Sequence, residues 1–570
     1  MLSQLLRLPK SLFVCLLLQD IAGVLGDTPP FFDDKKFDNG DYGPYPMQRF
    51  YSSELVAPRL NVLTTHPSCD DGSYTMFNPR GTKVPDDARG PMIIDAQGNL
   101  VWTVTGYEQT YDLMAQEYKG KQYLTFWSGN DAIGGHGNGH YIMLDTSYKE
   151  VARISAGNGL WGDLHEFRFT DAGTALLTVY DVQPIDLTPV GASPKGWIWD
   201  SVFQELNIET GEVVFQWRAS EHFSVVDSYH PPGGAGNSQK APYDFFHINS
   251  VEKDPKGNYL ISSRYTSTVS YIDGRTGEVI WVLGGKRNQF ADLSDGRATD
   301  FRFQHDARWQ EDHTMISLFS NDDEPGQKEK KPFSRPMKIR VDTVNFTAQL
   351  EGQYINKLEF LSSSQGSMQV LPNKNVLVGY GFSSAFTEFS PSGVALCESH
   401  FGASSRFGHG DVQSYRVMKF NWTGTPETRP SMTIISNSAF VSWNGATEVQ
   451  DWVLETGEKP AGRSHIKWTE GFKITKEGFE MELVLPKQRG TYVRISGLDA
   501  EGKILGTSRV PRCGGGGLSS TETMPRCPWQ TFNHVISVYI SFGFEVAYLC
   551  RRLSTSPMFF FATSSVPQRQ

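Results

Sequence analysis

A repeated alternation of tight turns and short apolar strands constrains the fold of this chain more than any other feature. Residues Tyr243–Arg264, together with 269–283, contain four strand-like segments separated by turns such as Asp254-Pro-Lys-Gly257. Proline fixes φ within such a turn and glycine closes it, so the chain reverses at each one. Four short strands in about forty residues are the size of one β-propeller blade.

The same pattern of turns and strands recurs along the chain as two half-motifs. A turn with Gly or Asn leading into an apolar strand occurs at 95–102, 119–125, 170–177, 254–260 and 371–377. The second half-motif is an acidic residue followed by Thr, Gly, Glu, two β-branched residues and an aromatic residue. It occurs at 209–215 and 273–281, with weaker copies at 145–151 and 390–396. The halves alternate in six units, near 60–105, 106–157, 161–220, 243–285, 303–355 and 364–402.

These repeats predict an all-β chain with a six-bladed β-propeller over residues 60–420. One small sheet cannot bury both of its faces, so neighbouring sheets must stack, and a closed ring shields the ends. The alternative left open by the pattern is a β-sandwich accompanied by unrelated strands.

Further segments flank the predicted propeller. Residues 27–59 form an N-terminal extension, and the turn-rich stretch Asn421–Pro430 reads as a linker. About seven short alternating strands over residues 431–511 predict a small immunoglobulin- or fibronectin-like β-sandwich with Trp443 as its buried anchor. Residues 512–570 begin with a run of glycines, which is typical of a flexible segment.

The two ends of the chain bear on its location. A short basic stretch followed by the apolar run Ser11–Leu18 predicts a secretory signal peptide over residues 1–26, with a retained signal anchor as the alternative. The apolar run Val535–Leu549 contains Glu545 and is shorter than the roughly 20 residues of a membrane span. We therefore expect a secreted, extracellular protein with a disordered tail, and a weak membrane anchor in that tail is the alternative.

Cysteines and sequons agree with an oxidising compartment. Cys69 lies in the first unit and Cys397 in the last, which a closed ring places side by side. We therefore predict a Cys69–Cys397 disulfide, and two buried free thiols are the alternative. Asn345 and Asn421 each begin an Asn-x-Thr sequon and are predicted to be glycosylated. The net charge of −10, without a basic stripe, argues against nucleic-acid binding.

Three histidines stand at the same phase of the repeat, at the start of the first strand of their units: His165, His247 and His305. The first strand of each blade lines the channel of a propeller, so equal phase predicts that the three imidazoles converge at one mouth. Arg264 ends the next strand after His247, and Asn249 shares a face with His247 because strand side chains alternate with period two.

This set of side chains suits the handling of a tetrahedral oxyanion. A neutral imidazole can act as a nucleophile, Arg264 and Asn249 can hold oxygens, and a second histidine can move a proton. Two alternatives remain, which are hydrogen-bonded histidines that pack the channel and a three-histidine zinc site. Because Arg264 would oppose a cation, we predict no metal.

Other residues could border the same mouth. Four aromatic residues could stack on a substrate ring or simply pack the blades, and they are Tyr265, Trp281, Trp309 and Phe382. The glycine-rich stretch Gly134–His140 is interpreted as a surface turn rather than a channel-mouth loop, and the loop Asp227–Ser238 is expected beside the mouth.

At these residues the chain resembles the arylsulfotransferase (ASST) superfamily, especially its secreted fungal members. The motifs that carry the resemblance are His165-Glu-Phe, His247-Ile-Asn-Ser, residues 254–264, residues 276–285 and Phe303-Gln-His-Asp-Ala-Arg308. The similarity covers most of residues 60–510. This chain lacks the N-terminal strand-rich module of the bacterial members and adds the C-terminal sandwich.

The resemblance implies transfer of a sulfuryl group from an aryl sulfate to a phenol, with no nucleotide donor and no cofactor. It implies that His305 is transiently sulfated, that His247, Asn249 and Arg264 bind the sulfate, and that His165 is the remaining channel histidine. A non-catalytic secreted or cell-surface binding protein is the alternative, and a hydrolase in which water replaces the phenol is a third.

Overall fold

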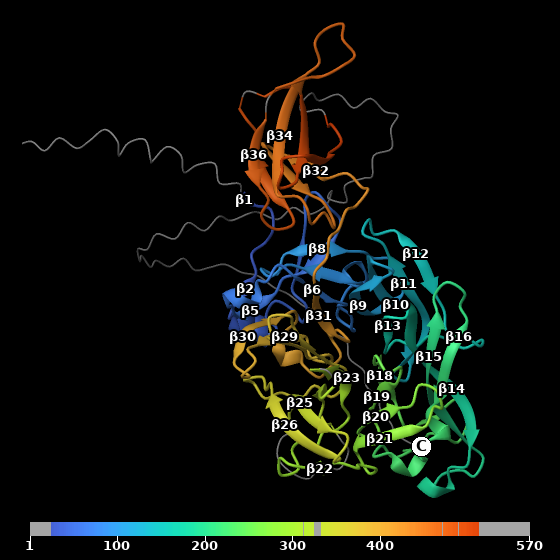
Figure 1. Cartoon of the computed structure of the whole chain (residues 1–570). Coiled ribbons are helices and arrows are strands. Elements are labelled where there is room, and N and C mark those ends of the chain that lie inside the picture. Colours follow the sequence, from blue (N-terminus) through green and yellow to red (C-terminus); the bar gives the residue numbers. More distant parts are fainter. Residues whose placement is uncertain (1–23, 312, 324–331, 470, 488, 512–570) are drawn as a thin grey trace, which may run out of the picture. The chain divides into compact units, whose positions relative to one another are not determined.

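The computed structural model describes residues 24–311, 313–323, 332–469, 471–487 and 489–511 (Figure 1). Within these ranges the chain is all-β, and its one α-helix is the short α1 (Lys35–Asn39). The described residues belong to one compact unit. Most of the predicted signal peptide and all of the predicted tail lie outside the described residues.

Six antiparallel sheets of four main strands each follow one another in the described part of residues 74–420. The first sheet contains β6 (Tyr74–Phe77), β7 (Met92–Ile94), β8 (Leu100–Thr103) and β31 (Val417–Phe420). The second contains β9 (Gln109–Tyr118), β10 (Lys121–Ile133), β11 (His136–Leu144) and β12 (Glu150–Ile154). The third contains β13 (Phe167–Phe169), β14 (Thr174–Ile185), β15 (Gly196–Asn207) and β16 (Val213–Arg218). The fourth contains β18 (Ile248–Lys253), β19 (Tyr259–Ser263), β20 (Thr268–Ile272) and β21 (Val279–Gly284). The fifth contains β23 (His305–Gln310), β24 (Met315–Ser320), β25 (Arg335–Asp342) and β26 (Thr347–Gln353). The sixth contains β27 (Ser367–Val370), β28 (Val376–Gly379), β29 (Ala385–Phe389) and β30 (Ala395–His400).

The six sheets contact one another in a closed cycle. Strand β9 contacts β13, β14 contacts β18, β18 contacts β23, β23 contacts β27, β27 contacts β31, and β31 contacts β9. The cycle closes because β31, from the end of this region, pairs with β6 from its start, with Val417 opposite Phe77. The first unit therefore differs from the expected one, since β5 (Asn61–Thr64) pairs with β30 of the sixth sheet instead.

Additional short strands extend three of these sheets. They are β2 (Phe31–Phe32) beside β5, β17 (Tyr243–Asp244) beside β15, and β22 (Ala291–Asp292) beside β26. Strand β17 matters for the site, because it carries Asp244 to the segment that leads into β18.

Apolar side chains fill the spaces between adjacent sheets. Between the fourth and fifth sheets, Trp281 and Trp309 are buried in one cluster with Leu283, Ile316 and Met337. The two indole rings lie 5.9 Å apart, edge to face. These tryptophans pack the sheets together, so they are not candidates for stacking on a substrate.

Cys69 and Cys397 form a disulfide in the structure. Cys397 lies on β30, and Cys69 ends the 3-10 turn Pro67–Cys69. The bond joins positions 328 residues apart. A cross-link that spans so long a stretch restricts the unfolded chain strongly.

The strands after the linker, together with β1, form two further sheets. One contains β1 (Val24–Leu25), β37 (Met481–Val484), β33 (Ser438–Ser442) and β32 (Ser431–Ile435); the other contains β35 (Lys467–Trp468), β34 (Asp451–Glu458), β38 (Tyr492–Leu498) and β39 (Ile504–Thr507), with β36 (Phe472–Thr475) beside β34. Trp443 is buried in their shared core, together with Trp452. The immunoglobulin- or fibronectin-like assignment stays a prediction.

The N-terminal extension holds a hairpin of β3 (Met47–Arg49) and β4 (Val56–Pro58) besides α1. No helix in the described ranges is long and apolar enough to cross a bilayer. The apolar run Val535–Leu549 is not among these residues.

Candidate functional site

The three histidines of equal repeat phase are all buried at the starts of inner strands. His165 lies two residues before β13, His247 lies directly before β18, and His305 is the first residue of β23. Their exposed fractions are 3%, 6% and 2%. His247 also has a positive φ of 59°, so the chain turns sharply just before entering β18.

The structure brings these rings to one place. The rings of His165 and His247 are 4.9 Å apart, centre to centre. Tyr415 lies against both His165 and His305, with ring separations of 5.5 and 6.3 Å. Arg264 adjoins this cluster through Tyr265, because its Cζ lies 4.9 Å from the Tyr265 ring centre and that ring lies 4.9 Å from the His247 ring.

Each histidine is held through its Nδ1 atom by an oxygen acceptor. The acceptors are Asp163 Oδ2 for His165 at 2.6 Å, Asp244 Oδ2 for His247 at 2.5 Å, and Asn321 Oδ1 for His305 at 2.6 Å. A neutral imidazole that donates its Nδ1 proton keeps a lone pair on Nε2. A ring in this neutral form has an Nε2 that can act as a nucleophile or base.

The acceptors could have been found in the sequence only in part. Asp163 and Asp244 precede their histidines by two and three residues, a shared Asp-before-His signal. Asn321 follows His305 by 16 residues and reaches it across the β23–β24 hairpin. The Asn321 amide donates to the carbonyl oxygens of Ser362 and Gln365, which leaves Oδ1 facing His305.

Arg264 and Asn249 are less completely engaged than the histidines. The guanidinium of Arg264 lies 4.8 Å from the Phe303 ring centre, and its Nη2 donates to Ser363 O at 2.9 Å. Its Nε is buried without a hydrogen-bond partner among the described residues. Asn249 donates to Gln304 O at 2.7 Å, whereas its Oδ1 has no such partner. Both side chains thus keep polar capacity for a ligand.

The nucleophilic face of His305 also has a neighbour. The backbone N–H of Gln365 donates to His305 Nε2 at 3.2 Å. The Gln365 side chain is itself fixed by Arg80 and Gln413. This contact requires Nε2 of His305 to be an acceptor, in agreement with the Nδ1–H form.

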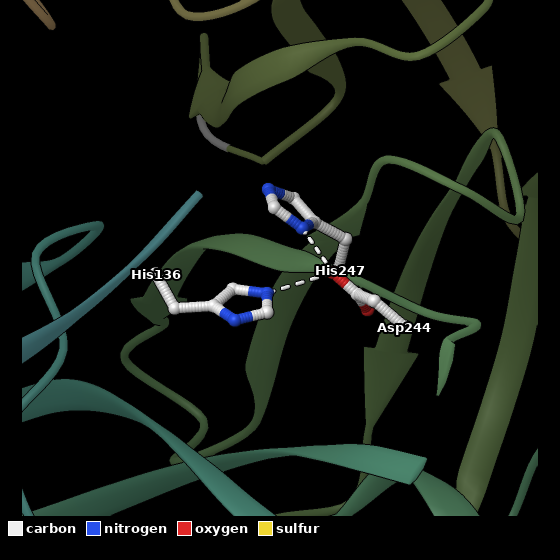
Figure 2. A group of neighbouring side chains, drawn as sticks. All are labelled: His136, Asp244 and His247. Carbon is white, nitrogen blue, oxygen red and sulfur yellow. Dashed lines mark hydrogen bonds and ion pairs between the residues drawn. The ribbon is translucent and has the colours of Figure 1, made fainter. Parts of the chain in front are cut away.

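His136 is a fourth histidine of the cluster and was not expected there. The tip of the β10–β11 hairpin does make a turn at Gly134 and Gly135, but His136 is only 1% exposed. Its Nε2 contacts Asp244 Oδ2 at 2.8 Å, the oxygen that His247 also uses (Figure 2). The glycine-rich stretch is therefore not a plain surface turn, and burial of its histidine depends on the neighbouring sheets rather than on local sequence.

Among the described residues, one group of side chains is close enough together to hold a metal ion. The donor atoms of His136, Asp244 and His247 lie within 4.8 Å of one another. The two nitrogen–oxygen contacts, at 2.8 and 2.5 Å, are hydrogen-bond distances. His136 Nδ1 has no partner in the described structure, whereas a metal-bound histidine usually donates its other N–H to a second group. The arrangement therefore fits shared hydrogen bonds better than a metal site.

Burial keeps His247 and His305 neutral. Desolvation lowers the pKa of His247 to about 3, although Asp244 acts in the opposite direction. Desolvation, together with the charge of Arg264, holds the pKa of His305 well below its ordinary value. An uncharged His305 is the form that can attack an electrophile.

This neutrality predicts a pH-dependent stability. The folded protein leaves His247 unprotonated while the unfolded chain takes up a proton below pH 6.5, so acidification favours unfolding. Between about pH 6.5 and pH 5, His247→Gln should lose stability less steeply than the wild type, by up to about 1.4 kcal/mol per pH unit. Urea unfolding at several pH values measures the slopes.

Two other buried histidines also contribute to the pH dependence of the stability. The pKa of His305 is lowered too, whereas the pKa of His400 is raised because its hydrogen bond to Asp38 and the nearby carboxylate of Glu398 outweigh burial. His400 therefore stabilises the fold at low pH and opposes the effect. Equal slopes in the wild type and His247→Gln would show that His247 is not held neutral.

A buried ionic network lies next to the histidines along the inner strands. Glu166 accepts from Arg308 Nη2 at 2.6 Å and from Arg416 Nη1 at 3.2 Å, and Arg416 Nη1 also donates to Asp112 at 2.8 Å. Arg308 Nε donates to Asp306 at 2.8 Å. Burial alone would raise the pKa of Glu166, but the two arginines lower it to about 2. These side chains come from four different sheets.

Aromatic rings surround His247 on its other sides. Tyr265 lies 4.9 Å from the His247 ring, and His230 from the Asp227–Ser238 loop stacks on Tyr265 at 4.3 Å. Tyr265 therefore remains a candidate for contact with an aromatic substrate. The loop lies beside the histidine cluster, as expected.

Comparison with solved structures gives low similarity. A protein of unknown function from Bacteroides caccae has a TM-score of 0.37 at 12% identity over 62% of this chain and 100% of its own. Kuenenia stuttgartiensis hydrazine synthase has a TM-score of 0.32 at 11% identity, over 57% of this chain and 75% of its own. A putative gluconolactonase has a TM-score of 0.32 at 9% identity, over 73% of this chain and 100% of its own. No curated protein matches the chain.

A family model gives the assignment that these structures do not. The model described as arylsulfotransferase (ASST) matches residues 114–402, which is half of the chain and includes His165, His247, Arg264 and His305. The chain therefore belongs to the arylsulfotransferase family.

Proposed function

We propose that this protein transfers a sulfuryl group from an aryl sulfate to a phenolic acceptor through a sulfo-histidine on His305, without a nucleotide donor. Family membership supports an arylsulfotransferase-like activity. The observation that carries the proposal is the cluster of His165, His247 and His305, each bound through Nδ1 to an oxygen acceptor, with the pKa of His305 lowered by burial and by the charge of Arg264.

The first half of the reaction forms the intermediate. His305 Nε2 attacks sulfur, the N–S bond forms, and the bond from sulfur to the aryl oxygen breaks, so that the electron pair leaves with the phenolate. Arg264, with its unpaired Nε, is suited to hold the sulfuryl oxygens. Asn249 would do so through the second N–H of its amide, because the first donates to Gln304 O and its unpaired Oδ1 is itself an acceptor. Neutral His305 needs no proton removed before it attacks, because its lone pair is on Nε2, but that lone pair must first give up the hydrogen bond from the Gln365 N–H.

The second half transfers the group to the acceptor. A phenol gives its proton to His247 Nε2 while its oxygen bonds to sulfur and the N–S bond to His305 breaks. The proton on His247 then passes to solvent, which restores the enzyme. His165, held by Asp163 in the same tautomer, is assigned as the remaining histidine of the site.

The proposal includes the setting of this chemistry. The six sheets act as the blades of a six-bladed propeller, with the histidine cluster at one mouth of its channel and an immunoglobulin-like sandwich after it. The protein is secreted with a cleaved leader, and glycans are attached at Asn345 and Asn421. Both asparagines are exposed, which such attachment requires.

The intermediate gives the direct test. After brief exposure to 4-nitrophenyl sulfate and rapid digestion at alkaline pH, mass spectrometry should find an acid-labile sulfuryl adduct on the peptide that contains His305. Addition of a phenol before digestion should remove the adduct. An aryl sulfate panel that gives neither adduct nor turnover would count against the proposal.

A non-catalytic binding protein is the second candidate, and the near-complete burial of the three histidine rings favours it. Such a protein would bind an aryl sulfate without altering it. Calorimetry distinguishes the two, since binding to a non-catalytic site should survive in His305→Ala and leave the ligand intact.

A further inference from the structure

Two imidazoles share one carboxylate oxygen beside the proposed reaction centre. Figure 2 shows His136 and His247 directed from different sides at Asp244. The nitrogens concerned are Nε2 of His136, at 2.8 Å, and Nδ1 of His247, at 2.5 Å, and both contact Oδ2. The proposed reaction uses His247 but assigns nothing to His136.

The Asp244 carboxylate has few other restraints. Its second oxygen, Oδ1, is buried and has no hydrogen-bond partner among the described residues. A carboxylate bound only by His247 could turn about its Cβ–Cγ bond together with that ring. The hydrogen bond from His136 Nε2–H to Oδ2 prevents this rotation, because it holds the oxygen from a second direction.

His136 is itself held rigidly. Its ring stacks on Tyr180 at 3.9 Å with an interplanar angle of 22°. The Tyr180 hydroxyl donates to the carbonyl oxygen of Ile248, the residue after His247. A closed chain of contacts thus runs from Ile248 to Tyr180, then to His136 and Asp244, and from Asp244 back to His247. It connects the second, third and fourth sheets.

We propose that His136 is a positioning residue for sulfuryl transfer, which fixes Asp244 and thereby keeps His247 in the tautomer whose Nε2 accepts the phenol proton. The inference rests on the proposed function. It assigns His136 a role in the second half of the reaction only, because formation of sulfo-His305 requires no proton transfer through His247.

A set of variants at position 136 separates this role from a merely structural one. His136→Leu removes the donor, and His136→Gln keeps an N–H that can reach Asp244. Loss of a hydrogen bond to a charged group predicts that His136→Leu lowers kcat by about ten- to a hundredfold, with KM for the aryl sulfate nearly unchanged. His136→Gln should recover most of kcat. His140→Leu, on the same strand but directed toward Ser155 and Trp161, is the control.

Rapid-quench measurements divide the effect between the two halves. Sulfo-His305 should form at the wild-type rate in His136→Leu, and its discharge to the phenol should be slow. Equal slowing of both halves, or no rescue by His136→Gln in a folded protein, would overturn the inference. Loss of wild-type activity with EDTA, restored by zinc, would also overturn it by making the three side chains metal ligands.

A second readout does not depend on turnover. Nitrogen NMR of histidine-labelled protein, with His247 assigned by the His247→Gln variant, reports which ring nitrogen carries the proton. We expect only the Nδ1–H form in the wild type and in His136→Gln, and a mixture of both forms in His136→Leu. An unchanged tautomer in His136→Leu would refute the positioning role, even if no substrate were ever found and the proposed function failed.

Discussion

Replacing His305 with alanine will lower sulfuryl transfer between an aryl sulfate and a phenol by more than about a thousandfold, because the nucleophile is lost and the remaining groups can only bind. The adduct found by mass spectrometry should vanish with the activity. His247→Gln should lower activity less, since a slow transfer can proceed without the base. Steady-state rates with varied phenol measure both.

The substitution also alters the packing, so folding has to be controlled. His305 is buried and bonded to Asn321, and alanine leaves that amide oxygen without its donor. His305→Gln retains bulk and polarity, and His409→Ala, at an exposed histidine, is the matched control. Transfer by a folded His305→Ala protein at more than a tenth of the wild-type rate would rule out the sulfo-His305 route.

Removing Arg416 is expected to have the largest effect on stability. Arg416→Met leaves the buried Asp112 without its close partner and takes one of two short arginine contacts from Glu166. Breaking a buried ion pair on one side costs about 3–5 kcal/mol, because the other charge remains in a low-dielectric surrounding. Chemical denaturation of the two proteins at neutral pH measures the difference.

A surface-accessible arginine gives the comparison. Arg494 makes two hydrogen bonds to Glu455 on a neighbouring strand, but its side chain is 30% exposed. Arg494→Met should therefore cost less than about 1 kcal/mol. If both variants were destabilised by the same small amount, the buried network would not be a main contributor to the stability of the ring of sheets.

The sequence predicted the features that depend on repetition. Turn residues and apolar alternation recur with the period of a sheet, and they located the strands and the shared phase of His165, His247 and His305. Convergence followed from that phase, because positions related by the repeat meet at the same place. The Asp-before-His spacing at 163 and 244 was also readable, although its meaning emerges only when the ring contacts are known.

Features that depend on contacts between sheets were not predicted. His136 lies in a glycine-rich hairpin whose local pattern is that of a turn, and contacts from neighbouring sheets, including those with Tyr180, Asp244 and His247, make it a buried residue. Trp281 and Trp309 looked equally suited to a ligand, because an aromatic side chain has the same sequence signal in a core as in a binding site. The partner of His305, Asn321, lies just after another strand, β24, and is unrelated to His305 by the repeat.

The pairing of β31 with β6 has a consequence for biosynthesis. Arg416 stands immediately before β31, so the residue that neutralises Asp112 and helps neutralise Glu166 arrives with the strand that completes the first sheet. A nascent chain must therefore leave the ribosome almost to position 420 before its earliest sheet is whole or its inner carboxylates are compensated. Until then the partly made ring exposes strand edges and uncompensated acidic groups, and premature termination anywhere upstream should yield a product for degradation rather than a smaller working protein.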